Sequence, residues 1–274
     1  MSVPDVQSRS EGFPKVYLPW VGVEGIQYPV YVYYPLTETF MQTLGKFNVY
    51  CSLNPEAKGV HMSRFYEVIQ DVFSEKRLLT QNVSVALDTV TSRLENENAR
   101  VEISFTYLVS TTAPVSRIDQ FLPVEVKVTG IRMKGNPDYI LISVDVPYTS
   151  LCPCSKEISQ FGAHNQRSIA SVTVTTPPNN EVLFEDLVGV VENVASAPIR
   201  ECLKRVDEKY VTERAYLSPV FVEDMVRLIG LELEKRALPY LIKVTHFESI
   251  HTHNAVAFAW SPDFNFALFN YLGN

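Results

Sequence analysis

The stretch Ser150-Leu-Cys-Pro-Cys-Ser-Lys-Glu-Ile-Ser-Gln-Phe-Gly-Ala-His-Asn-Gln-Arg167 places two cysteines one residue apart and a histidine ten residues beyond the second. Pro153 separates the thiols and makes a stiff corner, because proline fixes φ and has no N–H. Gly162 permits a sharp return that would bring the His164 imidazole back toward the thiols. Thiolate and imidazole are ligands for zinc and its first-row neighbours. The stretch therefore indicates a metal site or a nucleophile, with two ordinary buried thiols as the alternative.

The sequence before this stretch predicts one ββααββ unit. Runs that alternate in period two, or that are rich in aromatic and β-branched residues, predict strands, and apolar residues at helical spacing predict two helices. Ser63 is a possible cap of the first helix. The expected strands are 26–34, 46–53, 100–110 and 123–133, and the expected helices are 62–73 and 82–95.

The same order recurs in the second half of the chain. Strands are expected at 139–148, 167–176, 240–247 and 255–260, and helices from about 182 and over 219–236. The charged segment 204–216 has two interpretations. It is either a solvated helix end and loop, or a metal-binding carboxylate (Asp207 or Glu208) beside cations for phosphates.

This duplication predicts an α+β protein in which two antiparallel four-stranded sheets each carry a helix pair on one face. We expect a leader over residues 1–27, a first module over 28–134 and a second module over 135–274 that carries most of the site. Such sheets leave long edges that must be covered or paired. A closed oligomer in which the strands complete a barrel is therefore expected.

Composition excludes several classes of protein. A net charge of −7 argues against a general nucleic-acid binder, although a local cluster of Lys and Arg would still hold a triphosphate. No apolar run approaches the roughly 18 residues that a membrane span needs, and the polar N-terminus has no signal-peptide core. Four cysteines without regular spacing do not form a disulfide framework. We therefore expect a cytoplasmic protein with free thiols and no nucleic-acid or membrane partner.

A second cluster of polar residues precedes the last expected strand. Glu248 would face away from His251 and His253 in a regular strand, so a bend or bulge is needed to aim all three at one site. The alternative is an exposed polar turn. Glu223 begins the expected helix 219–236, where the helix dipole favours an acid, and it would carry protons if it faced a cleft.

Six stretches together resemble the type IB GTP cyclohydrolase family. The segment Cys152-Pro-Cys-Ser-Lys-Glu-Ile-Ser159 is the most specific part of the resemblance, and the chain departs from related chains at Ala197–Cys202. The six stretches are Gly59–Arg64, Tyr148–Ser159, Gly162–Ser168, Leu203–Glu213, Phe221–Asp224 and Phe247–Asn254.

The resemblance implies a tunnelling fold, in which tandem ββααββ modules assemble into a homotetramer with sites at subunit interfaces. It also implies a reaction, the opening step of tetrahydrofolate biosynthesis. In that step, water hydrolyses the guanine imidazole ring of GTP, formate leaves, and 7,8-dihydroneopterin triphosphate forms. Attack at C8 of guanine needs hydroxide near neutral pH, which a bound divalent metal supplies.

The resemblance further implies roles for individual residues. Glu248 matches the purine anchor, a carboxylate that accepts the guanine N–H donors in a bidentate pair. The implied ligands of the divalent metal, manganese, zinc or iron, are Cys154, His164, Glu208 and His253. The residues expected to assist the chemistry are Cys152, Glu223 and His251. The expected triphosphate contacts are Lys204, Arg205 and Arg64.

Two other functions stay open at this point. One is the nitrile reductase of queuosine synthesis, which shares the tunnelling fold and resembles this chain at Phe247–Ser249 and in its use of cysteine. That reaction uses a nicotinamide cofactor, and the chain has no glycine-rich dinucleotide fingerprint. The other is a non-catalytic purine- or metal-binding module, which predicts binding without turnover.

Overall fold

The computed structural model describes residues 12–35, 37–74, 78 and 80–266. Within these residues, strands hydrogen-bond in the order β1-β2-β3-β4-β5-β6-β8-β9, and β7 pairs with β5. The chain divides into two compact units. The first contains the described residues up to Phe105 with Lys127–Leu141 and Thr176–Glu181, and the second contains Thr106–Val126, Ile142–Thr175 and the described residues from Val182.

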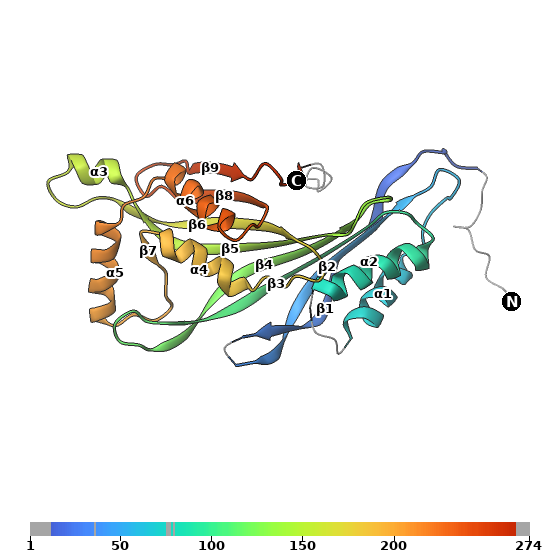
Figure 1. Ribbon diagram of the computed structural model, residues 1–274, viewed down its shortest axis with the longest axis horizontal. Coiled ribbons are helices and arrows are strands. Elements are labelled where there is room, and N and C mark those ends of the chain that lie inside the picture. The colour runs from blue at the N-terminus through green and yellow to red at the C-terminus, as the bar shows by residue number, and fades with distance from the viewer. Residues whose placement is uncertain (1–11, 36, 75–77, 79, 267–274) are drawn as a thin grey trace. The chain divides into compact units, whose positions relative to one another are not determined.

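The first unit packs a helix pair on strands (Figure 1). Its elements are β1 (Leu18–Tyr34), β2 (Thr39–Leu53), α1 (Ser63–Phe73), α2 (Thr80–Leu94) and parts of β3 (Ala99–Thr112), β4 (Asp119–Arg132) and β5 (Tyr139–Leu151). The apolar residues of α1 recur at helical spacing, and Phe65, Ile69 and Val72 are buried. Each such side chain contributes about 1.5–3 kcal/mol when it leaves water.

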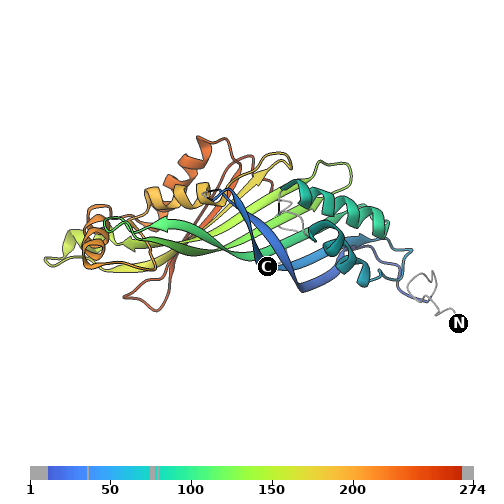
Figure 2. The ribbon, with the colours of Figure 1, turned by 90° about the horizontal axis from the view of Figure 1, so that it is seen from below.

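The second unit contains the remaining parts of β3, β4 and β5 and all of the later elements except Thr176, the last residue of β6. Those elements are α3 (Pro153–Ile158), β6 (Asn165–Thr176), α4 (Phe184–Val194), β7 (Ala197–Pro198), α5 (Arg205–Leu217), α6 (Val222–Glu234), β8 (Tyr240–His246) and β9 (Ala255–Trp260). Ala170, Val172 and Val174 of β6 are fully buried because alternate side chains share a face. Figures 1 and 2 both place α3, α5 and the β8–β9 connection at the same end of this unit.

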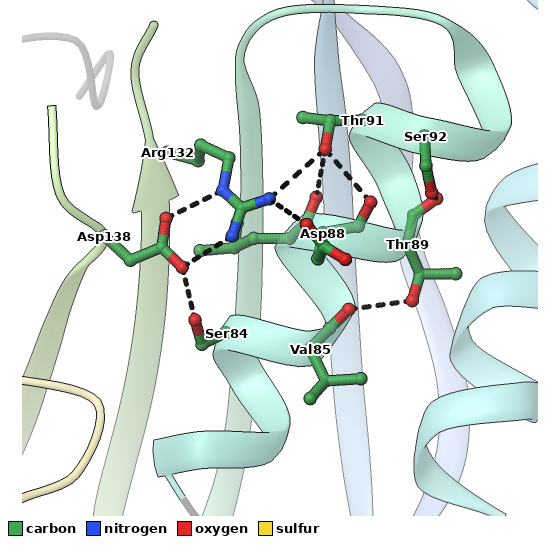
Figure 3. A network of polar contacts seen from close by, with 9 residues as sticks. Ser84, Val85, Asp88, Thr89, Thr91, Ser92, Arg132 and Asp138 are labelled. Atoms are coloured by element: carbon green, nitrogen blue, oxygen red, sulfur yellow. Dashed lines mark hydrogen bonds and ion pairs between the residues drawn. The ribbon is translucent and has the colours of Figure 1, made fainter. Parts of the chain in front are cut away.

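A charged network joins α2 to β4 and to the residue before β5 in the first unit (Figure 3). Arg132 donates from Nε and Nη2 to the Asp138 carboxylate at 2.8 and 2.9 Å, and from Nη1 to Asp88 at 2.6 Å. Ser84 of α2 donates to the same Asp138 carboxylate. The side chain of Asp138 is only 9% exposed, so its charge is compensated by Arg132 and Ser84 rather than by water.

The predicted order of strands and the α+β class are confirmed, with four differences in the elements. Strand β1 begins at Leu18, so the end of the expected leader is strand. Met62 is the N-cap of α1 and makes no side-chain bond, so Ser63 is not the cap. Helices α3 and α5 were not predicted, and α5 occupies the segment interpreted as helix end and loop. The prediction of two separate sheets is wrong, because β4 pairs with β5. The module boundaries stay predictions.

Candidate active site

The Cys–His stretch, residues 150–167, forms a short helix and a return between β5 and β6. Cys152 is the N-cap of α3, and its thiol accepts a hydrogen bond from the Ser155 N–H at 3.4 Å. Pro153 opens the helix, where a missing N–H is harmless. The Cys152 N–H donates to the His164 carbonyl at 3.1 Å, and the chain returns through Gly162 at φ +88°. The backbones of Cys152 and His164 are therefore tied together, as the spacing predicted.

The thiols of the chain differ in their surroundings. Cys154 is exposed on α3 and Cys152 is partly buried. Cys51 of the first unit is fully buried, and burial raises the pKa of its thiol to about 12, so that thiol stays protonated. Cys202 is exposed and lies outside residues 150–167, and its backbone N–H donates to the Gln120 side chain at 2.7 Å. Cys152 and Cys154 are thus the thiols on the element that contacts His164.

The His164 ring has two acceptors facing its Nδ1 atom. Gln166 Oε1 lies 2.9 Å from Nδ1, and Glu248 Oε2 lies 4.0 Å from it. A proton on Nδ1 leaves the Nε2 lone pair for a ligand. The side chains of His164 and Glu248 are 15% and 14% exposed, so both are largely enclosed while still reached by solvent. The predicted purine anchor and a predicted metal ligand therefore lie together.

The β8–β9 connection bends directly after His246, as a common site for its polar residues requires. His251 and His253 are exposed on this bend, and their rings stack with centroids 5.0 Å apart and 12° between planes. The two histidines therefore occupy an exposed turn, which was the alternative interpretation of this segment. Their ring nitrogens remain accessible to a ligand from outside this chain.

Helix α5 begins with a buried carboxylate that holds its N-terminus. Asp207 accepts hydrogen bonds from the Val115 and Ser116 N–H groups at 2.8 Å each, from the Ser116 hydroxyl at 2.6 Å and from the Lys204 N–H at 2.9 Å. Burial would raise the pKa of Asp207, but these bonds outweigh burial and lower that pKa below its usual range. Asp207 therefore has a structural role, and Glu208 is the acid that stays exposed.

Helix α5 packs on the Cys–His stretch through a small apolar cluster. The members are Leu151, Ala163, Ala197, Val211 and Ala215. Glu208 precedes Val211 and Ala215 by three and seven residues, so it lies on the same helix face. Lys156 of α3 adds a hydrogen bond to the Tyr216 carbonyl at 2.5 Å. The exposed Lys204 and Arg205 flank this face at the helix start.

The start of α6 approaches a buried histidine that the sequence reasoning missed. His246 is 4% exposed, and its Nε2 lies 2.9 Å from the Tyr148 hydroxyl. Burial lowers the pKa of His246 to about 4, although the charge of Glu223 acts in the opposite direction. Glu223 itself is exposed in the first turn of α6. The signal for His246 was its position in the expected strand 240–247, where alternate residues point inward.

The predicted ligands are not gathered in one cluster in the described part of the chain. The described residues contain no group of three or more His, Cys, Asp or Glu side chains that would hold a metal ion. The predicted set of Cys154, His164, Glu208 and His253 stays a prediction. Arg64 lies in the first unit, where its Nη1 donates to the Arg93 carbonyl at 3.2 Å. No helix among the described residues is long and apolar enough to cross a membrane.

Residues 3–257 match the family model described as type I GTP cyclohydrolase folE2. The GTP cyclohydrolase FolE2 of Azoarcus sp. (strain BH72) is 42% identical over 258 residues, which cover 93% of this chain and 94% of that protein. The GTP cyclohydrolase FolE2 of Methylobacillus flagellatus is 44% identical over 239 residues, with coverage of 86% and 88%. That of Herminiimonas arsenicoxydans is 40% identical over 258 residues, with coverage of 93% and 96%.

Solved structures are similar to this chain in fold at low sequence identity. A highly active BTUO mutant superposes with a TM-score of 0.50 at 8% identity, covering 89% of this chain and 99% of that chain. Uricase from Arthrobacter globiformis gives a TM-score of 0.49 at 10% identity, with coverage of 89% and 94%. The first of these likenesses shows the fold alone. The tunnelling fold predicted from the sequence is confirmed.

Proposed function

Because the chain belongs to the type I GTP cyclohydrolase FolE2 family, it is a GTP cyclohydrolase, and we propose that the region around the Cys–His stretch carries out its reaction. The enzyme hydrolyses the guanine imidazole ring of GTP, releases formate and yields 7,8-dihydroneopterin triphosphate for tetrahydrofolate biosynthesis. The observation that supports this location of the active site is the distance of 4.0 Å between Glu248 Oε2 and His164 Nδ1. A carboxylate suited to binding guanine therefore lies beside an imidazole suited to binding a metal.

The donors of this region fit a divalent metal such as zinc, manganese or iron. Cys154 offers an exposed sulfur, Glu208 an exposed carboxylate, and His253 an exposed imidazole. His164 offers Nε2, since both acceptors beside the ring face Nδ1. Sulfur, nitrogen and oxygen donors of this kind are accepted by these metals. When bound, the metal would supply hydroxide near neutral pH by lowering the pKa of water.

Cys152 is the thiol that competes with Cys154 for the metal. Its backbone is bonded to that of His164, whereas Cys154 lies two residues further along α3. We assign Cys154 as the ligand and Cys152 as a residue that assists the chemistry from beside it. Matched Cys152→Ser and Cys154→Ser variants separate the two roles. Cys154→Ser should lose bound metal, and Cys152→Ser should keep the metal while losing rate.

The remaining residues bind substrate and move protons. Glu248 accepts the N1–H and the 2-amino N–H of guanine, because a carboxylate offers two oxygens in one plane. His251 and Glu223 transfer protons during ring opening and the later ribose rearrangement, for which an imidazole and a carboxylate are suited. Lys204 and Arg205 bind the triphosphate at the start of α5, where the helix dipole also attracts anions.

We propose that the site is completed in a homo-oligomer, with a homotetramer as the expected state. Strands β1 and β9 end the strand order, so each has an edge without a partner strand among the described residues. Strand β9 also exposes apolar side chains, with Phe258 56% and Trp260 55% exposed. A second copy that pairs with such an edge would cover both features. Native mass spectrometry of the purified enzyme tests the expected four chains.

A fluorescence assay for the pterin product tests the function and its dependence on metal. Purified enzyme should form product and formate from GTP, lose activity with a chelator and regain it when a divalent metal is added. Undiminished turnover by protein that metal analysis shows to be metal-free would contradict the proposed mechanism.

Binding of GTP and ITP tests the role of Glu248. ITP lacks the 2-amino donor, so it makes one fewer hydrogen bond to the carboxylate. Glu248→Ala should weaken GTP binding more than ITP binding in calorimetry of the enzyme. Equal losses for the two nucleotides would remove Glu248 from the role of purine anchor.

A further inference from the structure

A line of polar residues is buried between β5, β6 and β8, below the candidate active site. All of them lie on the face of the sheet that the core covers, and each is at most 8% exposed. The members are Gln166 and Ser168 of β6, Tyr148 and Ser150 of β5, and His246 of β8. Antiparallel pairing sets Ser168 directly opposite His246. The line begins at His164 of the candidate active site, and the buried His246 lies at its other end.

Consecutive hydrogen bonds connect the members of the line that lie nearest His164. The Gln166 side chain contacts His164 Nδ1 through Oε1 at 2.9 Å and the Ser150 hydroxyl through Nε2 at 3.0 Å. The Ser150 and Ser168 hydroxyl oxygens are 2.8 Å apart. These contacts run from His164 to Ser168, and a separate hydrogen bond joins the Tyr148 hydroxyl to His246 Nε2 at 2.9 Å.

The orientation of the Gln166 amide decides which of its atoms faces His164. The amide nitrogen donates to the Ser150 hydroxyl oxygen at 3.0 Å, since an amide nitrogen has donors only. This orientation turns the amide oxygen of Gln166 toward His164. Because an amide oxygen only accepts, His164 must donate from Nδ1.

We propose that this buried line of hydrogen bonds fixes the tautomer of His164, with the proton on Nδ1 and the Nε2 lone pair presented to the active site. Gln166 is the positioning residue that contacts the ring, and Ser150 holds the orientation of its amide. Only the consequence for metal binding rests on the proposed function. The tautomer itself is a property of the protein without metal.

Glu248 does not replace Gln166 in this role. Its carboxylate oxygen is 4.0 Å from Nδ1, which is beyond hydrogen-bond distance, whereas Gln166 is at 2.9 Å. The carboxylate charge favours a proton on the same nitrogen without fixing the plane of the ring. A fixed ring orientation and tautomer are what a histidine ligand normally obtains from a partner on its second nitrogen.

Solid-state nitrogen NMR of metal-free enzyme with ring-labelled histidine tests the proposal directly. The chain has five histidines, and the signal of His164 is identified by its loss in His164→Asn. The expected wild-type spectrum shows His164 protonated on Nδ1 only. In Gln166→Leu and Ser150→Ala the signal should shift toward the Nε2–H form. Should Gln166→Leu fail to fold, Ser150→Ala removes a single hydroxyl and keeps the test intact.

Ser143→Ala is the matched control. Ser143 of β5 pairs with the Thr173 hydroxyl of β6 at 2.8 Å, so this variant also deletes a hydroxyl pair between the same two strands. Its odd position puts it on the opposite face of the sheet. The tautomer of His164 should be unchanged in Ser143→Ala.

Two NMR results would overturn the proposal: a wild-type His164 protonated on Nε2, or an unchanged tautomer in both Gln166→Leu and Ser150→Ala. Metal titration adds a second readout, in which Gln166→Leu should weaken affinity by about 10–100-fold and Ser143→Ala should not. Unchanged affinity in His164→Asn would instead refute the ligand role of His164, while the NMR result would still decide the inference about its tautomer.

Discussion

In the first unit, the polar contacts between α2 and the β4–β5 hairpin are charged, with Arg132 bound to Asp138 and Asp88 (Figure 3). In the second unit, the polar line between β5, β6 and β8 is neutral, and it ends on a histidine of the candidate active site. An ion pair satisfies its own members and holds two elements together. An amide has distinct donor and acceptor atoms, so a bond between it and a hydroxyl orients the group that contacts the histidine.

This contrast predicts that residues of the second unit change activity and those of the charged network change stability. The largest expected effect is on turnover. His164→Ala and Cys154→Ala should each lower kcat/KM about a thousandfold or more, because metal activation of water supplies several kcal/mol of the barrier. Native mass spectrometry should show both variants assembled as in the wild type. Cys202→Ala, which alters an exposed thiol outside the Cys–His stretch, is the control. A fully active Cys154→Ala would refute the proposed role of Cys154 as a metal ligand.

The next effect is on folding. Arg132→Met should lower the free energy of unfolding by about 2–4 kcal/mol, because it leaves the 9%-exposed carboxylate of Asp138 without its cation. The kcat of the folded variant should equal that of the wild type. Lys134→Met is the matched control, since Lys134 and Glu97 form a pair that is 70% and 61% exposed and should contribute less than about 1 kcal/mol. Urea unfolding measures the free energy of both variants. Equal losses of stability in Arg132→Met and Lys134→Met would contradict the prediction.

The buried His246, at the end of the polar line, makes the free energy of unfolding depend on pH. The pKa of His246 falls from 6.5 to about 4 on folding, mainly through burial. The unfolded chain therefore binds a proton first as pH falls, and stability present above pH 6.5 is lost between 6.5 and 4. We expect a loss on the order of 2 kcal/mol. Unfolding of wild type and His246→Gln at pH 7 and 4.5 measures it, and parallel curves would contradict the prediction.

The smallest expected effect is a difference in stability between two variants of the second unit that each lose one hydroxyl. Tyr148→Phe should lower the free energy of unfolding by about 1–2 kcal/mol, because it removes the hydroxyl that the buried His246 ring contacts through Nε2. Ser143→Ala, on the more exposed face, should cost about 0.5 kcal/mol. Chemical denaturation of both variants at pH 7 measures the difference. A larger loss in Ser143→Ala would mean that the buried line is not the tighter contact.

The sequence predicts those elements whose residues carry a periodic apolar pattern. Strand β6 was predicted from the alternation of its residues, and alternate residues of β6 are buried in the structure. Helix α1 was predicted from apolar residues at helical spacing, and these residues share a buried face. Helix α5 has buried side chains only at Asp207 and Ala215, so no apolar stripe marks it. Helix α3 has six residues and none of them is buried.

The candidate site was predictable only in part. The Cys152–His164 contact is local, and a proline, a glycine and a short spacing indicated it. The contact of Glu248 with His164 required the resemblance to a family, because the two residues lie in different connections of the second unit, Glu248 after β8 and His164 before β6. The line from Gln166 to His246 depends on the register of β6 against β8, which sets Ser168 opposite His246. Register is a tertiary property, and no local pattern in the chain encodes it.

Anomalous diffraction from crystals of the assembled enzyme loaded with zinc or manganese tests the central claim most directly. The account predicts one metal peak per chain, about 2.0–2.3 Å from Cys154 Sγ, His164 Nε2, a carboxylate oxygen of Glu208 and an imidazole nitrogen of His253. Residues of neighbouring chains should complete the set. A peak held by Nδ1 of His164, or one that lies away from His164 and both thiols of the stretch, would contradict it.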